Sequence, residues 1–383
     1  MTVENILEKL VSLPVFGGES NLTIIEWIKQ YIEAQGVETH LVPNEAGDKA
    51  SLHCRIGPPV DGGVILSGHA DVVPVEGQAW DTDPFVLTDK GDGKLYGRGS
   101  CDMKGFIACC LAGLPQMIQA ELKKPIYFAF SYDEEIGCLA GPELAATMRT
   151  FYEETPKYAI IGEPSLMETI VGQKGIYILE TYVTGSEGHS SRIKQEVSAI
   201  HESMRLVLWL ENKMDALIAA GHMDERFHPP HSSIHIGLIQ GGIAPNVIAN
   251  KAHFFWDLRT IPRDSVDEIV AEFETYCRER EELLRPICPD FSIRTIENHP
   301  PVPHLDTKDT DEVVALIQSL TGNTQLNTVA YAAEAGQFAN EGFHSAICGP
   351  GSIAQAHRAN EFIARDQLEQ GVQMLEKLIV RLS

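Results

Sequence analysis

The chain has 383 residues, of which 44% are hydrophobic and 22% are charged, the composition of a globular protein of two or three domains. This excludes disordered, collagen-like and coiled-coil chains, and no run approaches the ~20 consecutive apolar residues of a membrane span. Asp and Glu (54) outnumber Lys and Arg (30), for a net charge of −24. This charge argues against nucleic-acid binding, because phosphate would be repelled. It indicates either a solvated acidic surface or a preference for cationic ligands.

The N-terminal segment and the cysteines favour a cytoplasmic protein. No basic segment followed by an apolar run opens the chain, so we expect no secretory signal. The eight cysteines form no C-x-x-C pair and lie mostly in apolar runs, where a reduced cysteine behaves as a small hydrophobe. This pattern favours a reducing compartment over a disulfide framework.

The first 176 residues alternate between helical and short apolar patterns. Residues 1–35 predict two amphipathic helices, because their apolar side chains recur at helical spacing. Further along, short apolar runs predict strands and the segments between them predict helices: strands at 64–67, 126–130 and 158–161, helices at 106–119 and 139–148. This alternation is typical of an α/β domain with a mostly parallel sheet flanked by helices.

The middle of the chain predicts a second domain. Its order of elements is β-α-β-β-α-β, the ferredoxin-like unit: strands at 176–183, 233–239, 253–258 and 291–296, helices at 199–217 and 266–284. After a proline-rich linker the chain resumes with a helix, a strand and a last helix. We therefore expect a discontinuous first domain, 1–176 and 298–383, with a second domain, 177–297, inserted in it.

Metal-type ligands follow the predicted strands of the first domain. His69, Glu135, Glu163 and His357 each lie near the end of a strand, and Asp102 opens a helix. Carboxyl ends of parallel strands meet at one edge of a sheet, so these side chains are expected to converge. Two histidines and three carboxylates are the ligands of zinc or a similar ion. Five ligands exceed the need of one catalytic zinc, whereas two metals sharing one carboxylate account for the number.

Two neighbouring carboxylates extend this set. Asp71 lies two residues beyond His69, a spacing that suits a carboxylate holding the second ring nitrogen of the imidazole. Glu134 and Glu135 are adjacent, so they cannot point the same way in an extended segment. One can bind metal while the other faces the substrate as a general base; the alternative is that one of them is simply solvated.

Taken together, five motifs resemble those of the dinuclear zinc amidohydrolases and peptidases of family M20. They are Ser67-Gly-His-Ala-Asp71, Gly97-Arg-Gly-x-x-Asp-Met-Lys-Gly105, Asp133-Glu-Glu135, Gly162-Glu-Pro-Ser165 and Gln355-Ala-His357. Their order also matches, and the resemblance covers nearly the whole chain. It implies a zinc-exopeptidase-like catalytic domain and an inserted lid that also mediates dimerisation.

The resemblance also implies a role for each residue of the catalytic domain. Asp102 would bridge two divalent ions, which we expect to be zinc, with cobalt as the alternative. One ion would take His69 and Glu163, and the other Glu135 and His357. Asp71 would orient His69, and Glu134 would be the general base. The peptide between Asp102 and Met103 is often cis in this family.

Four further residues are candidates for catalysis or substrate binding. His189 matches a catalytic histidine that, in dimeric relatives, reaches the partner's active site and helps hold the tetrahedral intermediate, so a homodimer is expected. Asn246 matches an asparagine that meets the substrate, and Arg259 an arginine that grips its carboxylate. Glu334 could meet a substrate ammonium group. The simpler interpretations are a capping histidine, a turn asparagine and an ion pair within the lid.

Within the family, the resemblance is greatest to the acetylornithine deacetylase branch, through segments such as Gly99–Phe106 and Ser131–Cys138. It implies hydrolysis of N-acetylornithine to ornithine and acetate, a step of arginine biosynthesis. Desuccinylases, dipeptidases and other N-acyl-amino-acid amidohydrolases are the alternatives. The chain departs from the family pattern at Arg358–Asn360, Arg192–Lys194, Ala249 and Ala333. These departures spare the metal positions and the base, so they bear on the substrate.

Two other classes of protein are less well supported. A non-catalytic dimeric binding module would be favoured by loss of the base or of a metal ligand, and none is lost. A serine hydrolase of the α/β type needs a G-x-S-x-G turn, which the chain lacks.

Overall fold

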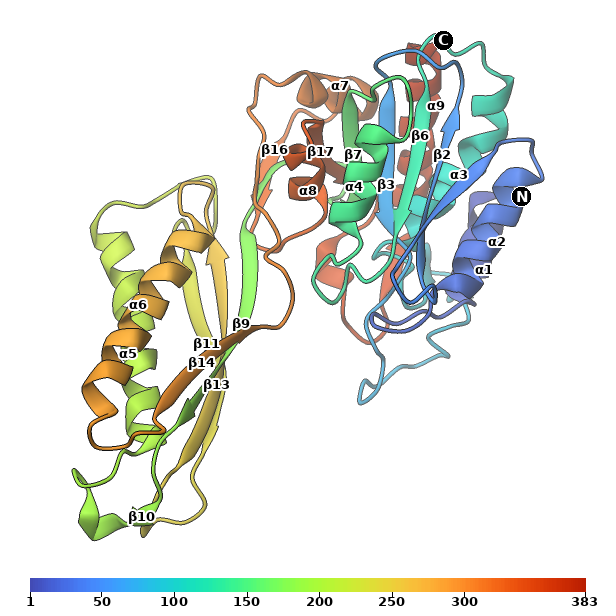
Figure 1. Ribbon diagram of the computed structural model, residues 1–383. Coiled ribbons are helices and arrows are strands. Elements are labelled where there is room, and N and C mark those ends of the chain that lie inside the picture. Colours follow the sequence, from blue (N-terminus) through green and yellow to red (C-terminus); the bar gives the residue numbers. More distant parts are fainter. The chain divides into compact units, whose positions relative to one another are not determined.

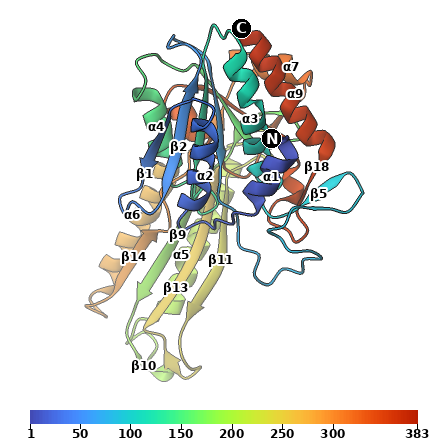
Figure 2. The ribbon, with the colours of Figure 1, turned by 90° about the vertical axis from the view of Figure 1, so that its right-hand side faces the viewer.

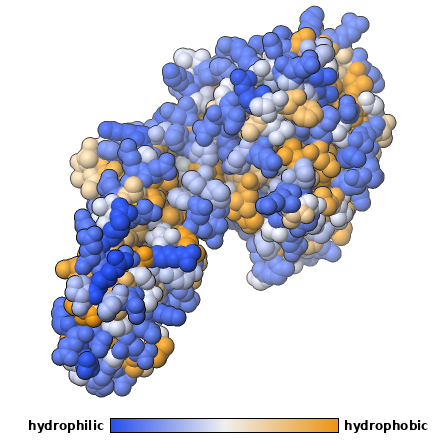
Figure 3. Space-filling view, in the orientation of Figure 1, coloured by the Kyte–Doolittle hydropathy of each residue, from blue (hydrophilic) through white to orange (hydrophobic).

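The computed structural model describes residues 1–383 and divides into two compact units (Figure 1). Unit 1 comprises residues 1–172, 305–328 and 333–383, and unit 2 comprises residues 173–304 and 329–332. The predicted insert, 177–297, lies within unit 2. On the face drawn in Figure 3, hydrophilic residues dominate the surface of each unit.

A nine-stranded sheet forms the centre of unit 1. Its strand order is β1-β2-β6-β3-β7-β17-β8-β15, and β16 also pairs with β8. The bounds are β1 (Thr39–Pro43), β2 (Ala50–Ile56), β3 (Val64–His69), β6 (Ile126–Ser131), β7 (Tyr158–Pro164), β8 (Thr169–Gln173), β15 (Leu305–Asp306), β16 (Leu326–Val329) and β17 (His344–Gly349). The central strands β6, β3, β7 and β17 are parallel, whereas β1, β2 and β8 pair antiparallel. The expected α/β fold is confirmed, with the parallel strands confined to the centre of a mixed sheet.

Helices cover both faces of this sheet, and Figure 2 shows α4 and α9 on opposite sides of it. On one side α3 packs against α1 and α9, and α7 against α9; on the other, α4 packs against α8. The bounds are α1 (Val3–Val11), α2 (Leu22–Glu33), α3 (Lys104–Gln119), α4 (Gly141–Thr150), α7 (Glu312–Thr321), α8 (Ala335–Asn340) and α9 (Arg365–Leu382). A three-stranded sheet, β18-β5-β4, contains β4 (Thr88–Asp89), β5 (Lys94–Tyr96) and β18 (Phe362–Ala364).

The sequence explains why the central strands are buried on both faces. In β6, every residue from Ile126 to Phe130 is aliphatic or aromatic and fully buried, as expected for a strand with helices on either side. Phe128 and Phe130 belong to the core that includes α3 and α9. The eight cysteines are all buried and none forms a disulfide.

Unit 2 is a four-stranded antiparallel sheet with two long helices. The strand order is β11-β13-β9-β14, from β9 (Gly175–Thr184), β11 (Ser233–Gly241), β13 (Lys251–Thr260) and β14 (Ser292–Glu297), with α5 (Ala199–Ala219) and α6 (Val266–Leu284). Along the chain the elements follow the predicted β-α-β-β-α-β order. Alternate residues of β13, such as Phe254 and Trp256, are buried in the core that these helices complete. No helix of either unit is long and apolar enough to cross a membrane.

Candidate metal centre and catalytic site

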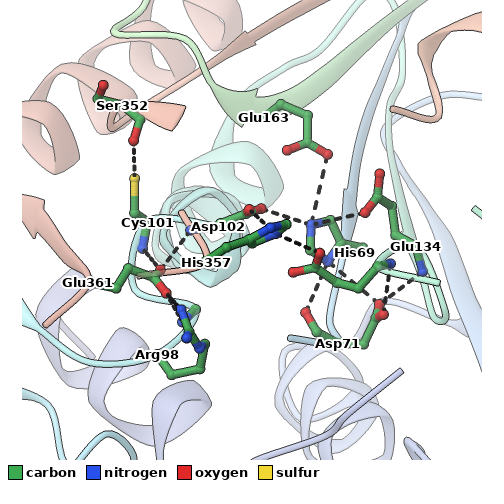
Figure 4. Close-up of polar contacts among 12 residues, drawn as sticks. His69, Asp71, Arg98, Cys101, Asp102, Glu134, Glu163, Ser352, His357 and Glu361 are labelled. Carbon is green, nitrogen blue, oxygen red and sulfur yellow. Dashed lines mark hydrogen bonds and ion pairs between the residues drawn. The ribbon is translucent and has the colours of Figure 1, made fainter. Parts of the chain in front are cut away.

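Five elements or loops of unit 1 bring the predicted ligands to one edge of the central sheet (Figure 4). His69 is the last residue of β3, and Glu163 lies at the end of β7. Glu135 follows β6 and Asp102 precedes α3. His357 follows the short 3-10 helix η2 (Ile353–Gln355), which comes after β17. Because β3, β6, β7 and β17 run parallel, their carboxyl ends lie side by side, as the sequence predicted.

Asp102 lies between two imidazole rings. Its Oδ1 is 3.1 Å from His69 Nε2, and its Oδ2 is 3.5 Å from His357 Nε2. On either side, Glu163 Oε1 is 3.8 Å from His69 Nε2, and Glu135 Oε2 is 2.9 Å from His357 Nε2. One carboxylate therefore faces two separate sets of ligand atoms, which is the arrangement required of a bridging ligand.

The donor set fits divalent metal ions. The ligand atoms of His69, Asp102 and Glu135 lie within 4.8 Å of one another, and so do those of His69, Glu134 and Glu163. Imidazole nitrogen and carboxylate oxygen suit zinc and similar ions. The second group includes Glu134, so geometry alone allows this residue as a ligand as well as a base.

The charges of the site also fit a cation. Burial and the neighbouring negative charges raise the pKa of Glu134 and Glu163 well above the ordinary value, and that of Glu135 to about 7. Burial alone would lower the pKa of His69, but the surrounding carboxylates, foremost Glu134, raise it well above the ordinary value. Buried carboxylates at such short range repel one another, and bound cations would relieve this repulsion.

Asp71 positions residues of the candidate metal centre through both its main chain and its side chain. The main-chain oxygen of Asp71 is 3.0 Å from His69 Nδ1, so in the neutral ring Nδ1 carries the proton and Nε2 is free to bind a metal. The carboxylate oxygens accept hydrogen bonds from the main-chain N–H groups of Glu134 (3.3 Å) and Glu135 (3.2 Å). The expected contact with His69 is therefore made chiefly by the backbone, while the side chain positions the paired glutamates.

The two adjacent glutamates lie in a turn, and their side chains point in different directions. The N–H of Cys138 donates to the main-chain oxygen of Glu134, so the segment after β6 turns instead of remaining extended. Asp133, which precedes the pair, has a φ of 55° and accepts hydrogen bonds from Lys49 Nζ (2.6 Å) and the Gly18 N–H (2.8 Å). Glu135 consequently points to His357 and Glu134 to His69, where the closest approach is 3.9 Å.

Comparison with known proteins gives the family. The model of peptidase family M20/M25/M40 matches residues 65–381. The chain belongs to this family. It is a hydrolase, and its relatives include proteins named as deacetylases and as peptidases.

The sequence relatives extend along most of the chain. The acetylornithine deacetylase of Pasteurella multocida is 32% identical over 370 residues, covering 94% of this chain and 91% of the relative. The acetylornithine deacetylase of Myxococcus xanthus is 33% identical over 371 residues, covering 94% and 92%.

Solved structures share the fold. An M20 metallo-carboxypeptidase from Sulfolobus solfataricus has a TM-score of 0.76 at 16% identity, with 98% of each chain covered. A Bacillus subtilis protein described as a dinuclear metal-binding peptidase of the M20 family has a TM-score of 0.61 at 15% identity, covering 99% of this chain and 97% of that one.

Three of the expected substrate residues of this M20 hydrolase lie in unit 2, at two different places. His189, in β10 (Gly188–His189), and Asn246 are neighbours, because β10 pairs with β12 (Val247–Ile248) and Ser190 N–H donates to Asn246 O (3.0 Å). Both are exposed. Arg259 lies near the opposite end of β13, eight residues beyond Lys251, which is about 26 Å at ~3.3 Å per residue.

Arg259 is engaged within unit 2. Its Nε is 2.9 Å from Asp257 Oδ2, and its Nη1 donates to the main-chain oxygen of Ala330 (3.0 Å). The structure therefore brings His189 and Asn246 together and keeps both far from Arg259 of the same chain.

Glu334, at the start of α8, is buried. Only 1% of its surface is exposed, and its Oε1 has no hydrogen-bond partner. Burial raises the pKa of this carboxyl group to about 7. The side chain does not reach open space, so its contact with a substrate ammonium group remains a prediction.

The M20 chain also has the expected cis peptide between Asp102 and Met103. Around this peptide the structure reveals residues that sequence reasoning did not select. Arg98 and Glu361 form a fully buried ion pair, 2.7 Å between Nη1 and Oε2, beside Asp102 (Figure 4). The only sequence signal was that Glu361 is retained where the residues before it depart from the family pattern.

Proposed function

We propose that this M20 hydrolase cleaves the amide bond of a small N-acyl amino acid, with N-acetylornithine as the first candidate. The observation that carries the reaction class is the position of Asp102 between His69 and His357 with Glu134 alongside. The acetylornithine deacetylases that are similar over most of the chain support the choice of substrate. Such a reaction would belong to arginine biosynthesis in the cytoplasm, to which eight free cysteines are suited.

Two divalent ions, which we propose to be zinc, would polarise the substrate carbonyl and lower the pKa of a bound water when present. His69 and Glu163 would hold one ion, and Glu135 and His357 the other, with Asp102 shared by both. Cobalt suits the same nitrogen and oxygen donors.

Glu134 is the general base in this proposal. Burial raises the pKa of its carboxyl group, which makes the ionised form a stronger proton acceptor than a solvated glutamate. The carboxylate takes a proton from the attacking water and delivers it to the leaving amine. Asp71 supports this role, because its hydrogen bonds to the backbone of residues 134 and 135 fix where the base points.

We further propose a homodimer formed through unit 2. The edge strand β11 has no partner on its outer side, and it exposes Leu238 and Ile239 beside α5, which exposes Met204 and Leu208; all four are 41–55% exposed. An unpaired edge with exposed apolar side chains favours pairing with a second copy. In such a dimer His189 and Asn246 would serve the partner's site, which their distance from Arg259 supports.

The substrate is tested by amine release from a panel. The zinc-loaded protein is assayed with N-acetylornithine, other N-acetyl amino acids, N-succinyl-diaminopimelate and a dipeptide, each with and without EDTA. We expect turnover of N-acetylornithine, preferred at least tenfold in kcat/KM and lost with EDTA. Preference for another member would keep the mechanism and overturn the substrate, whereas turnover that resists complete metal removal would contradict the mechanism.

A further inference from the structure

One buried carboxylate receives four hydrogen bonds beside the metal centre. Glu361 Oε2 accepts from Arg98 Nη1 (2.7 Å) and from the Gly99 N–H (3.0 Å). Its Oε1 accepts from the N–H groups of Cys101 (2.9 Å) and Asp102 (3.1 Å). The side chains of Arg98 and Glu361 are both 1% exposed.

These bonds determine the conformation of the loop that carries Asp102. Backbone N–H groups of residues 99, 101 and 102 point at one spot, and only an anion with two acceptor oxygens satisfies them together with Arg98. The loop is held a second time where the Gly97 N–H donates to the main-chain oxygen of Glu361 (3.0 Å). Because two N–H groups donate to each of its oxygens, Glu361 is engaged with the loop and Arg98, unlike the carboxylates that face the metal site.

The same pair reaches His357 through Gln78. Arg98 Nη2 donates to Gln78 Oε1 (2.6 Å), and Gln78 Nε2 donates to the main-chain oxygen of His357 (3.0 Å). His357 has a φ of 60°, a left-handed conformation that is disfavoured for residues other than glycine and persists only when neighbouring contacts hold it. The hydrogen bond from Gln78 is one such contact.

We propose that the Arg98–Glu361 pair is a positioning device for the metal ligands. Glu361 fixes the backbone of Asp102, and Arg98 fixes that of His357 through Gln78, so the two ligands of one ion keep their spacing. The inference rests on the metal-binding role proposed for Asp102 and His357. It assigns Glu361 and Arg98 neither to metal coordination nor to contact with substrate.

The test compares zinc affinity in matched variants. Glu361→Gln keeps the size of the side chain but replaces one acceptor oxygen by a donor, which cannot satisfy the N–H groups it would face. Glu154→Gln is the control, since Glu154 is another buried carboxylate of unit 1 paired with an arginine, Arg55 (2.9 Å), and it is not part of the metal centre. Affinity is measured by competition with a chromogenic zinc chelator, and the cobalt-loaded proteins are compared by visible absorption.

We expect Glu361→Gln to weaken one zinc site at least tenfold, within the 10–100-fold range of residues that support metal ligands, and to change the cobalt spectrum. Glu154→Gln should lower thermal stability and leave both sites intact. If Glu361→Gln does not fold, Gln78→Ala leaves Glu361 in place, removes the link from Arg98 to His357 together with the hydrogen bond from Trp80 Nε1 (3.1 Å), and should still weaken one site. Unchanged zinc affinity in Glu361→Gln, or equal weakening in the control, would overturn the inference; a wild-type protein that binds no zinc would overturn the proposed function and the inference with it.

Discussion

The sharpest prediction concerns Glu134, the proposed base. Glu134→Gln preserves the size and shape of the side chain but removes its ability to accept a proton. The surroundings tolerate an amide, because its oxygen can still accept the hydrogen bond from the Cys138 thiol (3.4 Å), and His69 Nε2 is 3.9 Å from the other terminal atom. We therefore expect an intact fold and a full complement of metal.

The expected loss can be estimated from the role. General bases contribute about 10²–10⁴-fold to the rate, which corresponds to about 3–5 kcal/mol of transition-state stabilisation. The loss should appear in kcat, with KM changed little. The neighbouring Glu135→Gln is the matched comparison, because it breaks the 2.9 Å contact with His357 and is expected to remove one ion per chain.

Two measurements on the purified variants decide the matter: amine release, and metal content by mass spectrometry. Loss of one ion from Glu134→Gln would make Glu134 a ligand, as the cluster with His69 and Glu163 allows. A variant that keeps more than a tenth of the wild-type kcat would move the base elsewhere. Either result would refute the reasoning.

Three further outcomes follow from the structure. Burial lowers the pKa of His53 from 6.5 to about 4; the unfolded chain therefore binds this proton first, and about 3 kcal/mol of stability should be lost as the pH falls from 6.5 to 4. In His53→Asn, urea titrations across this range should show that much less pH dependence, and an unchanged profile would contradict the assignment. Gly162→Ala would place a Cβ 2.0 Å from Phe106 Cγ, so we expect the free energy of unfolding, measured with urea, to fall by about 1–3 kcal/mol. A decrease of less than half of that lower bound would mean that the Phe106 ring moves aside. Removal of metal with EDTA should lower the Tm, because an ion that binds only the folded chain stabilises it, and added zinc should restore it; an unaltered Tm would count against bound metal.

The fold and the ligand set were predictable because their signals are local. Buried strands such as 64–67 and 126–130 are nearly pure apolar runs, and the first polar residues after them face one edge of the sheet. Strands β1 and β2 were missed, because His40, His53 and Arg55 interrupt their hydrophobic pattern near the edge of the sheet. Their register against β6 shows only in the assembled sheet.

The supporting residues were not predictable, for a different reason. Glu361 lies 259 residues from Asp102 along the chain, and its bonds go to backbone N–H groups, which leave no pattern in side-chain types. Lys49 and Asp133 are likewise 84 residues apart. Such contacts depend on where loops meet after folding, so a sequence reveals the ligands before it reveals what holds them.

Because β13 is long, residues of one site would come from two chains, and this has a consequence for mutant chains that pair with each other. His189 and Asn246 stand at one end of unit 2 and Arg259 near the other, so in the proposed dimer each site would draw on two chains. Two inactive chains, His189→Ala and Glu134→Gln, would then complement each other when they are mixed and allowed to exchange subunits. Random pairing of equal amounts would restore roughly one quarter of the sites. A His189→Ala allele would also inactivate the site of each wild-type chain with which it pairs, whereas a Glu134→Gln allele would leave that site intact.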